Sequence, residues 1–504
     1  MVRKKLTIPH ALLLKQRIVI LSWNKSIMNV QPINFSFRSR IPETEVRSTT
    51  YMTHGLYSYP AKFIPHVPYY VIKKYARQES SVVLDPFGGS ATTAIEAVRL
   101  GHNCIVMDNN PIVDVLAPAK TMQLDFNLDD GNTALELNEP ADGMSRNHVN
   151  INRIIEAIQV YPHNFVPAWK NIDHWVEPEF KPILEQVWGY LNDNPEDLSP
   201  CLLSLLKIAA MHVTDYFSNG ALDVPKLFKS KNRIKQIDRL KQRFQQNPGL
   251  PYSLLKEKFK KYHAMVKEFN DMIAGNNTIV THFDEKSIKN LDFARISPDE
   301  RFVLSIGGVD SINYQFPDQY QGSVDIIITS PPYVYAQEYI RSSKSHLYWL
   351  GIIDDLRATE LTRSEIGHRK GDTVSRILQE IGHVDSFASS FGKLLEIEQQ
   401  KYGKNGKYTP FIATYFHDMH RAIGNMKLLL KDGGIFGLFV GNPTVLGIQI
   451  ECSKIFSDFF EDQGYEVLEY GYDPIVNRQL LKGRKNENPN GMDFEWLIIA
   501  RKLN

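Results

Sequence analysis

Short, mainly apolar runs, each followed by a polar or glycine-rich turn, occur in two separate parts of the chain. The clearest runs cover 81–85, 103–107, 302–306 and 325–328. Mainly apolar runs of this length, rich in β-branched residues, are typical of strands buried on both faces of a parallel sheet. A helical pattern over 94–100 separates the first two runs, and Gly101 is placed to end that helix. The pattern therefore predicts an α/β fold with a mostly parallel sheet of the Rossmann-like kind.

Between these two parts, helical periodicity replaces the strand pattern. Predicted helices cover 149–160, 179–191, 200–216, 232–245 and 251–273. A segment of this length needs a packed core of its own. We predict an N-terminal arm, the first half of the sheet domain, an inserted mainly helical and partly basic subdomain, and the second half of the sheet domain, over 1–50, 51–122, 123–300 and 301–504. The last part is expected to end in an antiparallel hairpin formed by 466–470 and 494–500.

Composition narrows the class of protein only slightly. The chain has 504 residues, and its 43% hydrophobic and 23% charged content is ordinary for a globular protein. Its 58 basic and 57 acidic residues nearly cancel, so any nucleic-acid surface must be local. The three widely spaced cysteines form neither a disulfide framework nor a zinc-site pattern, and no apolar run is long enough to span a bilayer. We expect a soluble cytoplasmic protein with no metal and no membrane partner.

The turn after the first strand carries candidate ligand-binding chemistry. It reads Asp85-Pro86-Phe87-Gly88-Gly89-Ser90-Ala91-Thr92-Thr93, and the second strand ends at Asp108. Glycines allow a ligand to approach the backbone closely, and an acid at the tip of the second strand suits a ribose diol. The turn lacks the Lys-Ser/Thr ending of a nucleoside-triphosphate loop, and Asp85 would repel a pyrophosphate. A cationic nucleoside such as S-adenosylmethionine fits better, with Asp85 facing its amino-acid or sulfonium end and Asp108 its ribose.

The strand 325–328 leads into Ser330-Pro331-Pro332-Tyr333. Two prolines end a strand because neither can donate to a sheet ladder. This placement delivers Ser330, two stiff carbonyls and the ring of Tyr333 to the carboxyl end of a strand, where open α/β sheets bind ligands. A strand that simply ends in a tight turn is the alternative interpretation.

The second half of the inserted segment, from Lys226 to Lys261, is strongly basic. Such a charge run is typical of a solvated helix face, but it also suits a surface that binds phosphates. Both interpretations stay open at this point.

Taken together, these motifs resemble those of S-adenosylmethionine-dependent DNA amino-methyltransferases. The resemblance covers roughly 50–120 and 300–500, and the motif order is similar to the α-type arrangement of that family. It rests on Asp85–Thr93 as the cofactor loop, on Asp108, on Asp310-Ser311, on Thr329–Tyr333 as the catalytic motif, and on Tyr59-Pro60-Ala61-Lys62-Phe63 as the segment that precedes the loop. Ala91 stands where the family usually has a second glycine, which is harmless if its φ is negative.

The resemblance implies two groups of site residues, and the basic residues of the insertion and of 339–350 suggest a third. Cofactor contacts are expected from Lys62, Phe63, Asp85, Pro86, Phe87, Gly89, Ala91, Thr92, Asp108, Asn109 and Asp310. The expected catalytic residues are Ser330, Pro331, Pro332 and Tyr333. For contacts to double-stranded DNA we predict Lys226, Lys229, Lys231, Arg233, Arg341 and Lys344.

The implied reaction is methylation of an exocyclic amine on a base that has been flipped out of a DNA duplex. Serine at position 330 resembles the branch that acts on the 4-amino group of cytosine, with the 6-amino group of adenine as the alternative. The same resemblance suggests a restriction-modification system with a cognate endonuclease. An RNA guanine methyltransferase is a further alternative, disfavoured by Ser330 and by the lack of a recognisable RNA-binding module. A catalytically silent DNA-binding protein is the remaining one, disfavoured by the intact motifs.

Overall fold

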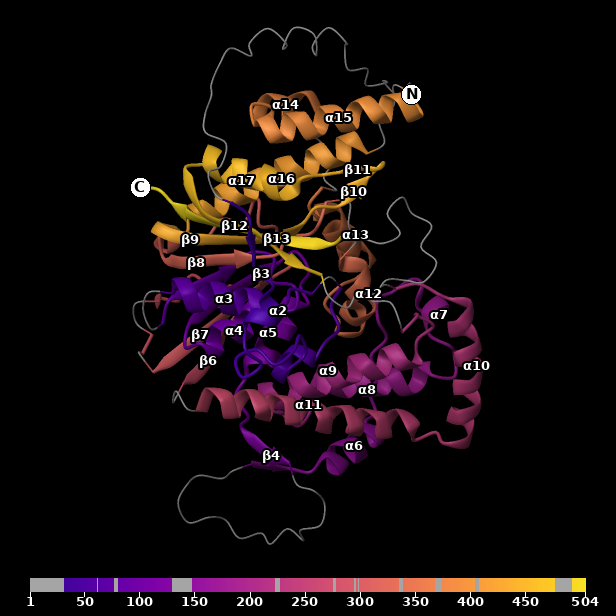
Figure 1. The fold of residues 1–504 in the computed structure, drawn as a ribbon. Coiled ribbons are helices and arrows are strands. Elements are labelled where there is room, and N and C mark those ends of the chain that lie inside the picture. The colour runs from indigo at the N-terminus through magenta and orange to yellow at the C-terminus, as the bar shows by residue number, and fades with distance from the viewer. Residues whose placement is uncertain are drawn as a thin grey trace, which may run out of the picture. The chain divides into compact units, whose positions relative to one another are not determined.

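The computed structural model describes two compact units. The described residues are 31–60, 62–76, 80–128, 147–222, 227–274, 278–293, 296–297, 299–334, 339–367, 374–403, 408–475 and 492–504 (Figure 1). The first unit, the parallel-sheet unit, consists of Ile41–Thr329 and Glu338–Glu365. The second, the antiparallel-sheet unit, consists of Met1–Arg40, Ser330–Gln337 and Ile366–Asn504.

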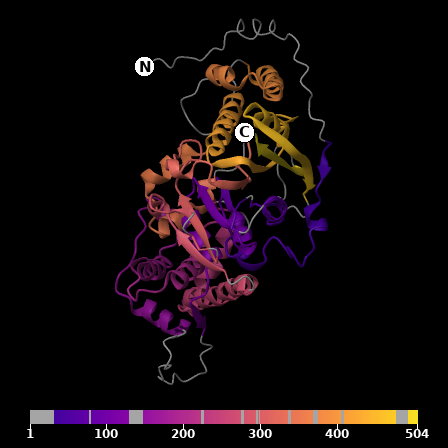
Figure 2. The same cartoon turned by 90° about the vertical axis from the view of Figure 1, so that its left-hand side faces the viewer.

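Five strands form the sheet of the parallel-sheet unit within its described residues. They are β2 (Val82–Asp85), β3 (Asn103–Asp108), β6 (Ile279–Phe283), β7 (Glu300–Gly307) and β8 (Val324–Thr329). Their order is β8-β2-β3-β7-β6, and each neighbouring pair is parallel. Figure 2 shows indigo and salmon strands of this sheet beside one another, although they are far apart in the chain. The apolar runs thus predict β2, β3, β7 and β8 to within about two residues, because buried parallel strands leave a continuous hydrophobic signal.

Strand β6 was not expected, because it lies inside the segment predicted to be a helical insertion. It is the edge strand next to β7. Ile279 is 59% exposed while Val280 is buried. An edge strand with few buried positions leaves too short a hydrophobic pattern to be separated from a loop. The sheet therefore resumes earlier than the predicted boundary at 300.

The helices of this unit before the insertion are α3 (His66–Tyr75), α4 (Thr92–Arg99) and α5 (Val113–Thr121), preceded by the 3-10 helix η2 (Met52–Gly55). The segment around η2 is tied to α4 by the fully buried Glu96. Its carboxylate accepts hydrogen bonds from His54 Nε2 at 2.8 Å and Arg99 Nη2 at 2.6 Å. A buried charge needs such partners, and here they hold the segment before the glycine-containing loop against the helix that follows it.

The insertion contains α6 (Ile151–Val160), α7 (Ile172–Trp175), α8 (Lys181–Asp193), α9 (Pro200–Phe217), α10 (Lys231–Gln246) and α11 (Leu250–Ala274), with a small parallel pair of β4 (Phe126–Leu128) and β5 (Asn147–Val149). The insertion shares its core with the later helix α12 (Tyr339–Trp349). The rings of Trp188 and Trp349 are 6.4 Å apart, and Trp169 stacks on Tyr348 at 4.8 Å. Helix α13 (Asp355–Ser364) and the 3-10 turns η3 (Glu285–Ser287) and η5 (Asp318–Tyr320) complete the unit.

The antiparallel-sheet unit has the strand order β1-β12-β13-β9. The bounds are β1 (Ile33–Asn34), β9 (Leu430–Gly441), β12 (Tyr465–Pro474) and β13 (Phe494–Lys502). Strands β12 and β13, which correspond to the predicted C-terminal hairpin, pair antiparallel, and β1 joins β12 in parallel. Part of the predicted N-terminal arm is therefore a strand of this sheet.

The remaining elements of this unit are α2 (Phe37–Arg40), α14 (Val374–Ile381), α15 (Asp385–Tyr402), α16 (Thr409–Lys427), α17 (Cys452–Asp462), β10 (Thr444–Val445) and β11 (Ile448–Gln449). In the part of the chain that the structure describes, no helix combines the length and the apolar character needed to cross a membrane.

The shared core of α12 and the insertion leads to a stability prediction. Trp349→Ala should lower the free energy of unfolding by about 3–5 kcal/mol, because it removes a fully buried aromatic ring and leaves a cavity. Val160→Ala, at a position that is 80% exposed, should change it by less than about 0.5 kcal/mol. Urea unfolding of the two variants measures both values. Equal stability of the two would show that α12 does not pack into this core.

Candidate functional site

A reversal of strand order marks the candidate site in the parallel-sheet unit. The chain runs from β2 to its neighbour β3 on one side, whereas β8 lies on the other side of β2. Open α/β sheets bind ligands beyond the carboxyl ends of strands at such a switch point. Asp85 ends β2 and Thr329 ends β8, so both lie at this position.

The Asp85 carboxylate holds three segments together at the switch point. It accepts hydrogen bonds from Thr93 Oγ1 at 2.6 Å, from Thr329 Oγ1 at 2.6 Å and from the Phe87 backbone N–H at 3.1 Å. Burial raises the pKa of Asp85 to about 6, and the hydrogen bonds act in the opposite direction. The loop, the start of α4 and the end of β8 are thereby joined through one side chain.

This geometry revises the role predicted for Asp85. We expected its carboxylate to face the charged end of a cofactor, but its side chain is only 2% exposed and serves protein donors. These hydrogen bonds hold the loop in position. Pro86, which follows Asp85, is also buried.

Backbone N–H groups of the loop reach the neighbouring strand β3. Gly88 N–H donates to the Met107 carbonyl at 2.8 Å, and Gly89 N–H donates to Asp108 Oδ2 at 2.8 Å. Gly89 has a φ of +43°, and a Cβ atom there would lie 2.9 Å from Cε1 of Tyr59. Glycine is therefore required at position 89 both by conformation and by space.

Ala91 adopts the left-handed conformation, with φ 59° and ψ 31°. From the sequence, alanine was expected to be harmless here if its φ were negative. That condition is not met. A non-glycine residue in this region costs about 1–2 kcal/mol. This conformation is maintained because Ala91 is completely buried and its N–H donates a hydrogen bond to the Gly88 carbonyl at 2.7 Å. Thr92 then begins α4, with its hydroxyl 3.2 Å from that of Ser90.

Asp108 is the acid best placed to receive a ribose. It is half-buried at the tip of β3, where Oδ2 accepts Gly89 N–H and Oδ1 accepts Asn110 N–H at 2.7 Å. A carboxylate has about four acceptor positions, so two hydroxyl donors can still be bound. Burial raises the pKa of Asp108 to about 7. The residue therefore fits a ribose diol.

Asp310 follows β7 at the same edge of the sheet. The Val309 N–H donates to the Asp108 carbonyl at 3.2 Å, which keeps the two acidic segments adjacent. The Asp310 carboxylate accepts Ile312 N–H at 2.9 Å and Asn313 Nδ2 at 2.8 Å, so it also stabilises its own turn.

Helices α12 and α13 are fastened to the tip of β3 by two asparagines. Asn109 donates to the Leu361 carbonyl at 2.9 Å and accepts the Ser364 hydroxyl at 2.7 Å. Asn110 Nδ2 donates to Ser343 Oγ at 2.7 Å. The Asn109 amide, predicted to contact a cofactor, is thus used to brace α13.

Sequence reasoning missed the positioning residues Asn110 and Ser343. It also gave no separate role to Tyr59, whose ring packs on Gly89 and lies 6.3 Å from that of Tyr339. The occurrence of Asn110 two residues after Asp108 was an available signal, because asparagine and aspartate side chains commonly bond to nearby backbone in turns. Nothing in the sequence indicated its contact with Ser343.

The predicted cofactor residue Lys62 is engaged by main-chain carbonyls. Its ammonium group donates to the carbonyls of Thr49, at 3.3 Å, and His54. Burial lowers the pKa of Lys62 to about 8. Phe63 beside it is half-buried. Contacts of these two residues and of Phe87 with a cofactor stay predictions.

The candidate catalytic motif belongs to the antiparallel-sheet unit, and its neighbours there fix its shape. Tyr415 Oη donates to the Pro332 carbonyl at 2.7 Å, and the Tyr333 hydroxyl donates to Glu495. A Cβ atom on Gly441 would lie 3.0 Å from the ring of Tyr333, so glycine there makes room for that ring.

The motif also contains two potential hydrogen-bond acceptors. Within the described residues, neither the Ser330 hydroxyl nor the Pro331 carbonyl has a hydrogen-bond partner. Both can therefore accept hydrogen bonds from a ligand.

The predicted DNA contacts are not all available. Arg233 is buried, and its guanidinium donates to the carbonyls of Ser218 at 2.7 Å and Tyr216 at 2.6 Å, so its prediction as a phosphate contact is wrong. The charge pattern could not show which face of the helix is buried. Lys226 lies outside the described residues.

The other predicted DNA contacts retain some exposure. Lys231 and Arg341 are exposed, whereas Lys229 and Lys344 are half-buried. Lys344 Nζ lies 5.9 Å from the centre of the Tyr348 ring. These four residues stay candidates for phosphate contacts.

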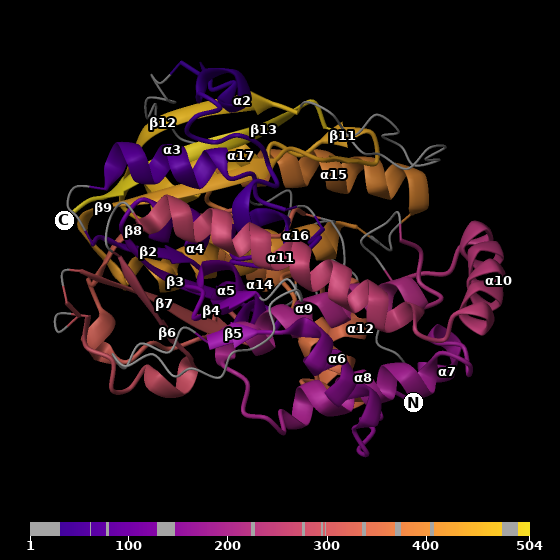
Figure 3. The same cartoon turned by 90° about the horizontal axis from the view of Figure 1, so that it is seen from below.

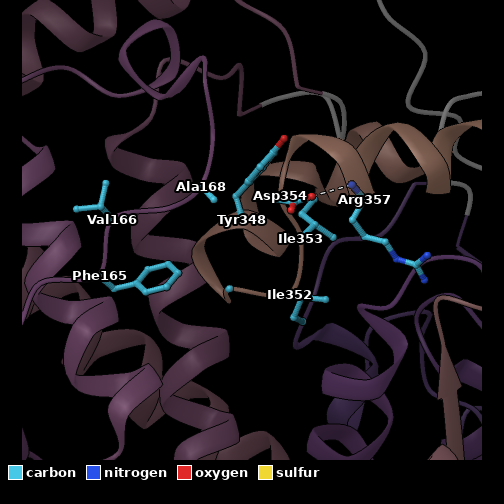
Figure 4. Close-up of a pocket in the computed structure, with 9 residues that line it drawn as sticks. Phe165, Val166, Ala168, Tyr348, Ile352, Ile353, Asp354 and Arg357 are labelled. Atoms are coloured by element: carbon cyan, nitrogen blue, oxygen red, sulfur yellow. Dashed lines mark hydrogen bonds between the residues drawn. The ribbon is translucent and has the colours of Figure 1, made fainter.

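A cavity of about 310 Å³ lies between the insertion and the turn that joins α12 to α13 (Figure 4). Phe165 and Val166 form one side, and Ile352, Asp354 and Arg357 are among the residues on the other. None of the predicted site residues lines it. The cavity is therefore separate from the candidate site at the switch point.

Comparisons with known proteins find similarity to DNA methyltransferases. A family model described as DNA methylase matches residues 23–115, which include the loop and Asp108. The chain is 21% identical to the type II methyltransferase M.MvaI of Kocuria varians over 461 residues, or 88% of each protein. It is 24% identical to M.BsoBI of Geobacillus stearothermophilus over 317 residues, 62% of this chain and 55% of that protein. Identity to M.MjaII of Methanocaldococcus jannaschii is 32% over 80 residues, 16% of this chain and 15% of that protein.

The parallel sheet, its switch point and the acid at the tip of β3 are consistent with a methyltransferase fold. The matches to type II enzymes support assignment of the chain as a DNA methyltransferase.

The raised pKa of Asp108 predicts pH-dependent cofactor binding. Below pH 7 its carboxyl group carries a proton and accepts ribose hydroxyls less well, so affinity for S-adenosylmethionine should rise with pH. For one group of pKa about 7, the dissociation constant at pH 6 should be about tenfold that at pH 8. Asp108→Asn should weaken binding by about 1.5–3 kcal/mol and remove this pH dependence.

Calorimetric titrations of wild type, Asp108→Asn and Asp318→Asn at several pH values measure the effect. Asp318 is exposed on η5, and its variant should behave like wild type. An unchanged affinity and pH profile in folded Asp108→Asn would exclude Asp108 from the cofactor site.

Proposed function

We propose that this protein transfers the methyl group of S-adenosylmethionine to the 4-amino group of a flipped-out cytosine in double-stranded DNA, as the modification enzyme of a restriction-modification system. The observation that carries the proposal is that the Ser330 hydroxyl and the Pro331 carbonyl have no hydrogen-bond partner among the residues that the structure describes. They belong to a turn fixed by two prolines and by the bond from Tyr415 to the Pro332 carbonyl.

An exocyclic base amine needs these acceptors because its lone pair is delocalised into the ring. The amine has two hydrogens, and the Ser330 hydroxyl and Pro331 carbonyl can each accept one. Holding both hydrogens favours a lone pair that is localised on the nitrogen and not delocalised into the ring. Because the turn is rigid, the two acceptors are already in place before the reaction. S-adenosylmethionine, when bound, supplies a methyl group activated by a sulfonium.

The cofactor residues of the proposal are divided by role. Asp108 accepts the ribose hydroxyls, and Gly89 allows close approach of the ligand to the loop. Asp85 positions that loop and, through Thr329, the strand end from which Ser330 continues. Asp310, Lys62 and Phe63 complete the predicted set.

Tyr333 is proposed to stack on the flipped base. Its ring is half-buried, and the bond from its hydroxyl to Glu495 fixes its orientation. Base–aromatic stacking is worth about 1–3 kcal/mol and offsets part of the cost of extruding a base. The cytosine assignment rests on serine at position 330, and adenine 6-amino methylation is the alternative outcome.

Removing one acceptor gives the sharpest test of the mechanism. Ser330→Ala should keep the turn, which the prolines set, and raise the barrier by about 2–4 kcal/mol, by analogy with the loss of one oxyanion donor. Single-turnover methylation measures the rate, and calorimetry should show unchanged S-adenosylmethionine affinity. A variant as fast as wild type would exclude Ser330 from the reaction.

The stacking role of Tyr333 has its own matched pair. Tyr333→Ala should weaken capture of the target by about 1–3 kcal/mol, whereas Tyr333→Phe keeps the ring and should retain most of it. A mismatched target base, which flips more easily, should partly rescue the alanine variant. If Tyr333→Phe weakens target capture as much as Tyr333→Ala does, the hydrogen bond from the hydroxyl to Glu495 accounts for the effect, and the stacking role is refuted.

The product decides the function. DNA from cells that express the protein should contain 4-methylcytosine, detected by mass spectrometry of the hydrolysed nucleosides, and Ser330→Ala expression provides the control. A product of 6-methyladenine alone would overturn the cytosine assignment. Methylation of RNA with none in DNA would overturn the DNA proposal.

A further inference from the structure

Helix α10 presents a regular row of positive charge on one exposed side. Lys231, Lys235, Arg239 and Arg243 follow one another at intervals of four residues, and all four are exposed. Within the described residues none of them forms an ion pair with a carboxylate, and Arg243 donates only to the Tyr216 hydroxyl at 3.0 Å. We refer to these four residues as the α10 row.

The other basic residues of α10 have structural roles. Arg233 is buried against the carbonyls at the end of α9, and Lys241 forms ion pairs with Glu177 at 2.5 Å and Glu179 at 3.4 Å. With the buried Ile237 and Leu240, these contacts fix the inward side of the helix. The helix is thereby held so that its remaining charge faces solvent.

The position of α10 leaves the row accessible. The helix lies at the outer edge of this helical group in two perpendicular views (Figures 1 and 3). At its N-terminal end, Arg341 of α12 donates to the Leu227 carbonyl at 3.3 Å, four residues before Lys231. The row therefore starts close to the helix that follows the candidate catalytic motif in the chain.

Helix stability alone would favour Arg243, which lies in the last turn, but not Lys231 at the other end of the row. The first turn of α10 has no acidic residue, and Lys231 adds positive charge to an end where the helix dipole is already positive. Asp238 is the one acid of the helix. The positive charge of Lys231 at this end lowers helix stability slightly but increases attraction for a polyanion.

The dimensions of the row fit a nucleic-acid backbone. A spacing of four residues at 1.5 Å rise places successive charges about 6 Å apart along the axis, or about 18 Å from first to last. Phosphates of one DNA strand follow one another every 3.4 Å or so of duplex axis, so this length spans about five of them. The row turns by about 120° around the helix over that length, which long lysine and arginine side chains can accommodate.

From this geometry we propose that α10 is a phosphate-contacting surface that holds double-stranded DNA beside α12, with the α10 row as its contacts. The proposal rests on the proposed function for its choice of DNA as the polyanion. It replaces Arg233 as a predicted contact and adds Lys235, Arg239 and Arg243.

The test is the salt dependence of binding to a short mixed-sequence DNA duplex, because the recognition sequence is not needed for phosphate contacts. Replacing all four row residues with glutamine should reduce the slope of log K against log salt by about 3 to 4, near 0.9 per lost contact. Affinity at about 0.1 M salt should fall tenfold or more. S-adenosylmethionine affinity should not change, because the row is remote in sequence and contact from the loop.

Two matched variants separate position from total charge. The first removes the same charge from exposed lysines elsewhere, at Lys73, Lys74, Lys289 and Lys393, and should change the slope by less than one. The second exchanges lysine for arginine and arginine for lysine within the row and should keep the wild-type slope. Thermal unfolding confirms that each variant is folded.

An equal loss of slope in the row variant and the charge-matched variant would overturn the proposal, because position would then not matter. The proposal would also be overturned if the row variant lost salt slope with duplex RNA but kept the wild-type slope with duplex DNA. If the wild-type protein methylates DNA but the row variant keeps the wild-type salt slope, the proposal for the α10 row is refuted and the proposed function stands. Wild-type protein with neither DNA binding nor DNA methylation would instead refute the proposed function.

Discussion

The buried Asp85 carboxylate is the interaction on which the candidate site depends. Its bonds to Thr93, Thr329 and the Phe87 N–H join the start of α4, the end of β8 and the loop between β2 and α4. Burying a charge is unfavourable unless its hydrogen bonds are satisfied, and three donors at 2.6–3.1 Å satisfy this one. The strained φ of Ala91 can persist because its surroundings are held in this way.

A second set of contacts extends this order beyond the loop. Asn109 and Asn110, which follow Asp108, bind α13 and α12 respectively through their side chains. The tip of β3 thus organises both the predicted ribose acid and the helices that come after the catalytic motif in sequence. Helix α12 also packs into the core of the insertion, through the ring pairs Trp188–Trp349 and Trp169–Tyr348, so the tip of β3 and the insertion contact the same helix.

The sequence predicted the parallel sheet well because buried strands require continuous apolar runs, as in β2 and β8. It also located Asp108 and the Ser330–Tyr333 turn, since their place follows from where each strand ends. It missed β6, whose edge position leaves few buried residues. It could not distinguish Arg233 from Lys231, because the inward side of a charged helix is decided by packing against α9. The positive φ of Ala91 and the bracing role of Asn109 likewise arise from tertiary contacts.

The central claim is that Asp108 binds the nucleoside, whereas Asp85 positions the protein around it. A crystal structure of the protein with S-adenosylhomocysteine tests this claim most directly. We expect both ribose hydroxyls within hydrogen-bonding distance of the Asp108 carboxylate, while Asp85 keeps its bonds to Thr93 and Thr329. A ribose bound by other residues, or an Asp85 carboxylate that leaves the two threonines to contact the ligand, would contradict the account.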